Sequence, residues 1–250
     1  MRAPALLVAL LLVGCGGDEG GAEGTGGSGG AGAGGAGTGG GGGAGGGGAS
    51  CTDPSHTGEA TYYDADGSGN CGFEPSPGDL RVGAMNHTDY AESASCGRCA
   101  QIQGPSGSVT VRIVDQCPEC KPGDIDLSPQ AFEKLADPKL GRVPITWSYV
   151  ACPVSGPLRY RFKEGSNQWW TALQIRNHRY GIAKLEVEKG GAFVAVPRES
   201  YNYFVDASGM GPGPYTFRVT DVHGHVLVDS GIAHVEATEV PGAAQLPDCP

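Results

Sequence analysis

Two aspartates flank a short cysteine-containing loop in residues 114–129, which read VDQCPECKPGDIDLSP. Asp115 follows the alternating run SVTVRIV, where we expect a strand to end, and Asp126 follows a tight Pro122-Gly123 turn. Carboxylates joined by such a loop can converge on one groove, and a protonated carboxyl near a leaving oxygen can assist cleavage of a glycosidic bond. The same spacing also fits carboxylates that cap a helix or accept buried backbone N–H groups.

Two of the three tryptophans, Trp169 and Trp170, are adjacent in the polar segment EGSNQWWTALQIRN. Successive side chains on a regular strand point to opposite faces, so both rings cannot lie in the core. If Leu173 and Ile175 face inward, Trp169 is expected inside and Trp170 outside. Both rings could meet a ligand only if the strand began at Trp170 or carried a bulge.

The first residues indicate export. Residues 1–15, MRAPALLVALLLVGC, predict a signal peptide whose apolar run is too short to span a membrane. Its end resembles a bacterial lipobox, which implies a lipid on Cys15; an ordinary secretory signal is the alternative. We therefore expect a cell-surface lipoprotein or a secreted protein. Gly16, which stands where aspartate is associated with inner-membrane retention, favours the outer membrane.

Composition divides the remainder. Residues 16–50 are mostly glycine and predict a disordered linker, because such a segment buries too little surface to offset its chain entropy. Residues 51–152 carry 7 basic and 14 acidic side chains, and residues 153–250 carry 9 and 10. Neither part is basic, so nucleic acid is not an expected partner.

The elements that would position the aspartates are short strands and one clear helix. Residues 108–115 and 143–150 alternate as strands do, and Trp147 is expected in the core. Ser128 and Pro129 predict a helix start within residues 128–137. This mixture over residues 51–152 favours a closed barrel with one or two short helices.

Residues 153–250 show strand signals throughout, which favours a β-sandwich. Hairpin turns are predicted at Lys189-Gly190-Gly191 and at residues 222–225. We expect His223 and His225 to form a solvated hairpin and not a metal pair.

Eight cysteines remain when Cys15 is set aside, and an even number in an exported chain predicts four disulfides. Spacing alone leaves 105 pairings open. The pairs Cys96/Cys99 and Cys117/Cys120 could instead hold zinc, but no histidine stands near them at ligand spacing. We expect neither a metal nor a cofactor.

Several segments resemble a bacterial expansin, in the same order and over most of residues 58–235. They include GEATYYDADGSGNCGF, SCGRCAQIQGPSGSVTVRIVDQCPECKPGDIDLSPQAF, YRFKEGSNQWWTALQIRNHRYGIAKLEVE and YNYFV. The resemblance implies a mainly β protein, with a six-stranded double-psi β-barrel followed by an immunoglobulin-like carbohydrate-binding sandwich. It also implies a monomer that binds cellulose or a related wall glucan and loosens wall polysaccharide without hydrolysis.

The resemblance also assigns residues. It places Thr61, Asp115 and Asp126 in the barrel groove; Trp169, Trp170 and Tyr201 on a sugar-binding platform; and Lys163 beside that platform. Cys117 stands where bacterial members often have tyrosine, which removes one aromatic contact from the groove. Tyr201 could alternatively be buried, with Asn202 exposed.

The implied disulfides are Cys71–Cys96, Cys99–Cys152, Cys117–Cys120 as a staple of the groove loop, and Cys51–Cys249 as a tie between the ends.

Two other functions stay open. Family forty-five endoglucanases share the implied barrel and an acid that matches Asp126, and inversion needs a second carboxylate as base. Asp64 and Asp66 in TYYDAD lie one residue to either side of the position of that base, and a one-residue shift turns a strand side chain to the other face. The third possibility is a binding module with no loosening activity.

Overall fold

The computed structural model describes residues 51–249. The signal peptide predicted for residues 1–15, the lipid on Cys15 and the linker predicted for residues 16–50 lie outside the described residues. Within residues 51–249, no helix has both the length and the apolar character needed to cross a membrane.

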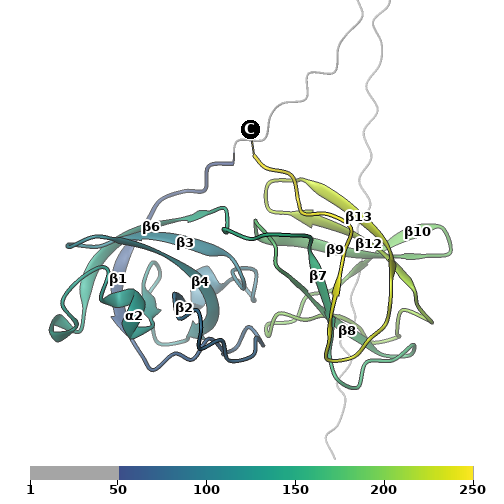
Figure 1. Cartoon of the computed structure of the whole chain (residues 1–250), viewed down its shortest axis with the longest axis horizontal. Coiled ribbons are helices and arrows are strands. Elements are labelled where there is room, and N and C mark those ends of the chain that lie inside the picture. Colours follow the sequence, from purple (N-terminus) through teal and green to yellow (C-terminus); the bar gives the residue numbers. More distant parts are fainter. Residues whose placement is uncertain (1–50, 250) are drawn as a thin grey trace, which may run out of the picture. The chain divides into compact units, whose positions relative to one another are not determined.

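The N-terminal half of the described chain forms a closed six-stranded barrel (Figure 1). The strand order around it is β1-β5-β2-β4-β3-β6, in which β1/β5 and β2/β4 are parallel pairs. The strands are β1 (His56–Tyr62), β2 (Val82–Asn86), β3 (Cys99–Gln103), β4 (Ser108–Cys117), β5 (Ile125–Leu127) and β6 (Val143–Val150). The predicted mainly β fold with a six-stranded double-psi barrel is confirmed.

The alternation in β4 fills the barrel. Val109, Val111 and Ile113 belong to the main barrel core, while Val114 packs in a smaller cluster with Val82. The strand continues to Cys117, so the prediction that Asp115 ends it was wrong. The strand is longer than its apolar alternation because its last residues, up to Cys117, still pair with β2.

The barrel carries two short helices and a 3₁₀ turn. They are α1 (His87–Tyr90), α2 (Pro129–Phe132) and η1 (Pro138–Leu140). The predicted start of α2 is confirmed, because the Ser128 hydroxyl accepts the N–H of Ala131 at 3.1 Å and Pro129 is the first helical residue. The helix itself is shorter than predicted.

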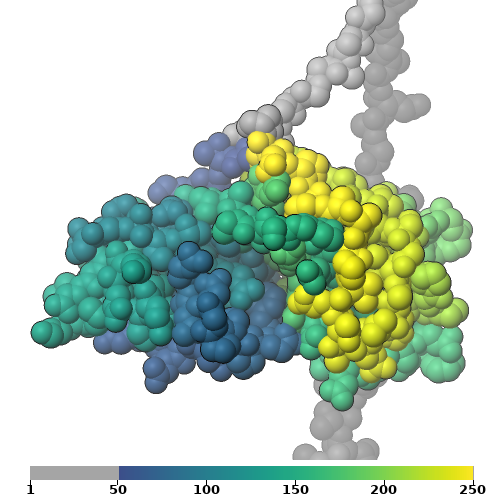
Figure 2. Space-filling view, viewed as in Figure 1, coloured from purple at the N-terminus to yellow at the C-terminus, as the bar shows by residue number. Residues whose placement is uncertain are grey.

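The C-terminal half is a sandwich of two four-stranded sheets, ordered β10-β9-β12-β13 and β11-β8-β7-β14. Its strands are β7 (Arg159–Phe162), β8 (Thr171–Arg176), β9 (Ile182–Lys189), β10 (Ala192–Val196), β11 (Phe204–Asp206), β12 (Tyr215–Asp221), β13 (Val226–Ile232) and β14 (Glu239–Pro241). In the space-filling view the two halves occupy separate regions (Figure 2). The predicted division at residues 152/153 falls between β6 and β7.

The predicted hairpin between β9 and β10 is confirmed. Lys189 pairs with Ala192 around a two-residue turn, and Gly190 and Gly191 both have positive φ, at 59° and 82°. A type I′ turn needs left-handed backbone at both positions, which glycine adopts at little cost.

The loop between β12 and β13 differs from the expected solvated hairpin. Only 8% of the His223 side chain is exposed, and its ring packs edge-on against Tyr180 with centroids 4.9 Å apart. His225 lies 2.8 Å from the carboxylate of Asp221. The hairpin turn at residues 222–225 is confirmed, since β12 and β13 pair on either side of it. The prediction that its histidines are solvated was wrong, because the turn folds back onto neighbouring side chains, which sequence spacing does not reveal.

Strand β8 is buried along its whole length because both faces are covered. Leu173 and Ile175 enter the sandwich core. From β8, Gln174 and Arg176 donate hydrogen bonds to the carbonyl oxygens of Cys71 and Gly72 in the barrel, at 2.9 and 3.1 Å. A polar contact thus joins barrel to sandwich.

The described residues contain four disulfides: Cys51–Cys249, Cys71–Cys96, Cys99–Cys152 and Cys117–Cys120. These are the pairs that the resemblance implied.

Candidate functional site

The barrel carries a row of polar side chains across four neighbouring strands. Thr61 on β1 is the register partner of Asp126 on β5, which is also a partner of Ala84 on β2. Ala84 in turn pairs with Asp115 on β4. The small Ala84 therefore stands between the two aspartates, since register partners on adjacent strands are side by side.

A register irregularity in β2/β4 brings Asp115 into this row. Gly83 pairs with Ile113 and Ala84 with Asp115, so Val114 is the extra residue of a bulge. In a regular strand Asp115 would share the face of Ile113, which lies in the barrel core. The bulge changes which face the following side chain takes.

The carboxyl group of Asp126 is half-buried, and its Oδ1 accepts a hydrogen bond from Thr61 Oγ1 at 2.5 Å. Burial raises the pKa of Asp126 above its ordinary value, although the Thr61 hydrogen bond opposes this shift. The negative charges of Glu119 and Asp115 add to the increase, and Arg142 opposes it. This site therefore favours the neutral acid more than water does.

Asp115 is held differently. Its Oδ1 accepts the backbone N–H groups of Asn70 at 2.6 Å and Gln116 at 2.8 Å. Gly69 presses against it so closely that a Cβ there would come within 2.3 Å of the carboxyl carbon. Asp115 is thus fixed by backbone donors, while Asp126 meets a side-chain hydroxyl.

Tyr63 is a groove residue that the sequence reasoning missed. Burial, followed by the charges of Asp115 and Asp126, raises the pKa of its phenol, so it stays protonated as a donor beside two carboxyls. Its hydroxyl is buried, and interaction with the side chain of Asp115 adds to the increase in its pKa. The signal available in the sequence was its position two residues after Thr61 in TYY.

A cavity of about 400 Å³ opens beside Asp126. It is lined by Glu59, Thr61, Cys117, Glu119, Cys120, Lys121, Asp124, Asp126 and Arg142. The Cys117–Cys120 disulfide thus forms part of its wall. Asp64 and Asp66 are not among the lining residues, and the carboxylate that most raises the pKa of Asp126 is Glu119.

The tryptophan pair lies in a turn and not on the strand, because β8 begins only at Thr171. The N–H groups of Trp169 and Trp170 both donate to Asn167 Oδ1, at 2.9 and 3.1 Å. Trp169 is 72% exposed and Trp170 half-buried. The expectation that Trp169 points inward was wrong, since period-two alternation does not apply in a turn.

A glycine supports this turn from behind. Gly209 has φ +76°, and a Cβ there would lie 2.4 Å from the Cα of Trp169. Gly211 donates its N–H to the carbonyl oxygen of Gln168 at 3.0 Å. The exposed ring therefore projects from a backbone that is fixed on two sides.

Tyr201 and Lys163 extend the aromatic surface. Tyr201 is 38% exposed while Asn202 is 5% exposed, so the alternative with Tyr201 buried and Asn202 exposed is wrong. Tyr203, which the sequence reasoning did not single out, links the two: its ring lies 5.8 Å from that of Tyr201 and 5.7 Å from Lys163 Nζ.

The platform extends along β8. Antiparallel pairing of β11 with β8 places Phe204 opposite Leu173 and Asp206 opposite Thr171, so the turn that precedes β11 and holds Tyr201 lies away from the start of β8, where the tryptophans are.

A hydrogen-bond chain joins groove and platform. Asn70, whose N–H binds Asp115, donates from Nδ2 to the carbonyl oxygen of Ser200 at 3.1 Å, and Tyr90 donates to the same oxygen at 3.0 Å. Ser200 immediately precedes Tyr201. One aspartate of the groove is thereby two hydrogen bonds from the start of the platform.

The raised pKa of Asp126 predicts a pH-dependent effect of Asp126→Asn. A carboxyl whose folded-state pKa lies above its unfolded value contributes stability that is present at low pH and lost as the pH rises through the folded pKa. The variant cannot ionise, so its Tm relative to the native protein should increase between about pH 3 and pH 7. Thermal unfolding across this range measures it; a constant or falling difference would contradict the shift.

The fold and site define a class: a double-psi β-barrel with a carboxylate groove, followed by a sandwich with exposed aromatic rings. Comparison with known proteins agrees. A family model described as "Lytic transglycolase" matches residues 55–147. Expansin-YoaJ of Bacillus subtilis is 38% identical over 211 residues, which cover 78% of this chain and 88% of that protein.

Solved structures give the same answer. A crystal structure of an expansin from Clavibacter michiganensis matches with a TM-score of 0.72 and 32% identity, over 77% of this chain and 98% of that chain. A substituted form of that expansin in complex with cellohexaose matches equally well. The chain belongs to the expansin family.

Proposed function

We propose that this protein binds cellulose or a related β-glucan along Trp169, Trp170 and Tyr201, with Lys163 alongside, and loosens contacts between wall polysaccharides without hydrolysis. The observation that carries the proposal is the 72% exposure of Trp169 on a turn fixed from behind. A ring held in water in this way is available to stack on a sugar face. The Clavibacter michiganensis relative in complex with cellohexaose supports this class of ligand.

The groove supplies the loosening step in this proposal. Thr61, Asp126 and Asp115 present hydroxyl and carboxyl groups in one row, which can exchange hydrogen bonds with the hydroxyl groups of a glucan. The raised pKa of Asp126 increases the fraction of its protonated form, which donates as well as accepts hydrogen bonds. Such competition weakens contacts between glucan chains and breaks no covalent bond.

The proposal of no hydrolysis rests on the two aspartates that the sequence offered as the base. Asp66 is exposed and accepts both the hydroxyl and the backbone N–H of Ser68, at 2.6 and 2.8 Å, which lower its pKa and make it a weaker base. Asp64 is exposed and does not line the cavity beside Asp126. Three other carboxyl groups do line that cavity. Asp124 accepts the backbone N–H of Glu59 at 2.8 Å and Glu59 is paired with Arg142 at 2.9 Å, so Glu119 is the carboxyl group to test as a base.

The endoglucanase alternative is tested by reducing-sugar release from cellulose and from a soluble β-glucan. We expect no release above that of a heat-inactivated sample, because inversion needs a base at about 6.5–9.5 Å from the acid with room for water. Sustained release that is lost in Asp126→Asn and in Glu119→Gln, Asp64→Asn or Asp66→Asn would replace the proposal with an inverting endoglucanase.

We also infer that the protein is exported and anchored through a lipid on Cys15, with domains at residues 51–152 and 153–250. The lipobox-like end of residues 1–15 supports the anchor, and the paired cysteines support an oxidising compartment. Neither residues 51–152 nor residues 153–250 carry a net positive charge, so nucleic acid is not proposed as a partner, and the net charge of −1 over residues 153–250 fits a neutral polysaccharide.

A further inference from the structure

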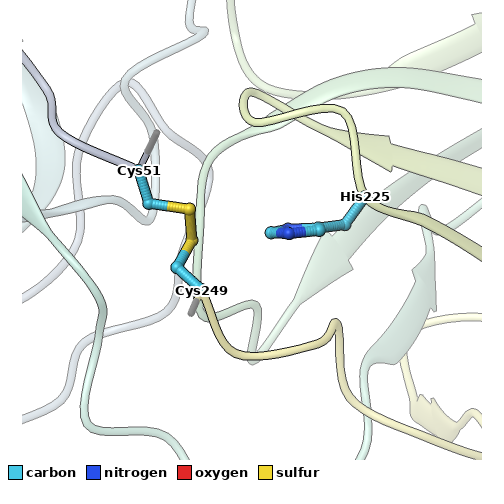
Figure 3. Close-up of side chains that lie close together, drawn as sticks. All are labelled: Cys51, His225 and Cys249. Carbon is cyan, nitrogen blue, oxygen red and sulfur yellow. A yellow bond between two sulfur atoms is a disulfide. The ribbon is translucent and has the colours of Figure 1, made fainter. Parts of the chain in front are cut away.

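A disulfide, an imidazole and a buried carboxylate meet where the first and last described residues come together. The ring of His225 is directed at the Cys51–Cys249 bond (Figure 3). The two sulfurs and a ring nitrogen all lie within 4.8 Å of one another. Metal ions bind thiolates, which a disulfide does not offer, so this cluster is not a metal site in its oxidised form.

The imidazole is held in one orientation. His225 Nδ1 lies 2.8 Å from Asp221 Oδ2, and the other oxygen, Oδ1, accepts the backbone N–H groups of His223 and His225, both at 2.9 Å. Asp221 is only 1% exposed. Because a carboxylate accepts the Nδ1 proton, Nε2 is left as the nitrogen that can take a proton from a nearby sulfur.

This disulfide is also more accessible than two of the others. Both of its cysteines are half-buried, whereas the cysteines of Cys71–Cys96 and Cys99–Cys152 are at most 5% exposed. Cys117–Cys120 is partly accessible too, but within residues 51–249 it belongs to no comparable cluster with a histidine. Only Cys51–Cys249 therefore combines access with an oriented imidazole in the described part of the chain.

We propose that Cys51–Cys249 is a thiol-exchange site, where a low-molecular-weight thiol forms a mixed disulfide with this chain and His225 transfers the proton. Nε2 of His225 takes the proton of the incoming thiol, and the resulting thiolate attacks one cysteine sulfur. A new S–S bond forms as the Cys51–Cys249 bond breaks, and the displaced thiolate takes the proton from the imidazolium. One disulfide replaces another, so there is no net oxidation or reduction.

Exchange would break the covalent link between Cys51 and Cys249, which are 198 residues apart in the sequence. It would leave the noncovalent contacts of the C-terminal segment in place. Strand β14 remains paired with β7, and Leu246 remains in the sandwich core. Asp248 forms an ion pair with Arg179. The modified chain thus keeps its C-terminal segment docked while it carries a thiol adduct beside the predicted linker.

The test follows glutathione exchange in the oxidised full-length chain near neutral pH. Samples are quenched with an alkylating reagent, and adducts at each cysteine are quantified by peptide mass spectrometry. We expect Cys51–Cys249 to exchange first, and His225→Gln to slow its exchange by about a hundredfold, the lower end of the range for positioned acid–base groups. Cys117–Cys120 in the same molecule should exchange at an unchanged rate.

His87→Gln is the matched control, because His87 is exposed and bonds to Gln116 on the barrel. It should leave both rates at the native value. Asp221→Asn should slow only Cys51–Cys249 if Asp221 acts by positioning the ring. The proposal is overturned if His225→Gln exchanges at the native rate, or if Cys117–Cys120 opens before Cys51–Cys249 in the native protein.

Discussion

Trp169→Ala is expected to lower the affinity for insoluble cellulose about fivefold, and Trp169→Ala combined with Trp170→Ala about thirtyfold. Each stacked ring is worth about 1 kcal/mol beyond its buried area, and every 1.4 kcal/mol is a factor of ten. Trp169 is 72% exposed, so its side chain contributes little to the fold. Depletion isotherms on microcrystalline cellulose measure the loss.

The matched control is Tyr62→Ala. Tyr62 is 40% exposed, so it is also an accessible ring, but it lies on β1 and packs against Phe132. Its removal should leave cellulose binding unchanged. If the double tryptophan variant bound cellulose with native affinity, the platform would be wrongly assigned, independently of any role of the groove. Because Trp170 is half-buried, the Tm of each variant should accompany the isotherms.

The platform also shows where sequence reasoning reaches its limit. Period two correctly placed Leu173 and Ile175 in the core, since both are on a regular strand. The same rule failed at Trp169, four residues before Leu173, because Asn167 caps the N–H groups of both tryptophans and makes a turn. The start of a strand is fixed by such local bonds, which hydrophobic periodicity does not report.

The presence of a barrel could be predicted from the sequence, but the residues that pair between its strands could not. Local signals located the strand that contains Val109, the cap at Ser128 and the turn before Asp126, and the resemblance supplied the topology. The order Thr61, Asp126, Ala84, Asp115 depends on pairing between segments far apart in the chain. No local pattern encodes that pairing, and the bulge at Val114 reverses the face that alternation assigns to Asp115.

The cluster around His225 could not be predicted from the sequence, for a related reason. Cys51 and Cys249 come from the two ends of the described residues, and Asp221 comes from a hairpin of the sandwich. The pairing Cys51–Cys249 was implied by resemblance, but nothing in the spacing of His223 and His225 points to a disulfide. Only the folded-back turn brings the ring to the sulfur atoms.

Asp126→Asn and Asp126→Ala are expected to slow wall loosening by about tenfold or more while cellulose binding remains at the native level. Asp126 is the half-buried carboxyl that Thr61 bonds at 2.5 Å in the groove. A hydrogen bond to a charged group is worth about 1.5–3 kcal/mol, so its loss should reduce the rate of loosening by about tenfold or more. Extension of heat-inactivated wall strips under constant load measures loosening, and depletion isotherms measure binding.

Comparing Asp126→Asn with Asp126→Ala distinguishes the chemical role of the carboxyl group from its contribution to packing. Asparagine keeps an acceptor oxygen for the Thr61 hydroxyl and nearly the same volume, but it removes the acid proton and the charge. If Asp126→Asn were as inactive as Asp126→Ala, the titrating carboxyl would be the active feature; native activity in Asp126→Asn alone would assign the role to the acceptor.

Asp66→Asn, which changes an exposed aspartate whose side chain accepts hydrogen bonds from Ser68, should retain loosening. Loss of cellulose retention in Asp126→Asn would refute the division of labour between groove and platform, because the tryptophans and Tyr201 are unchanged in that variant.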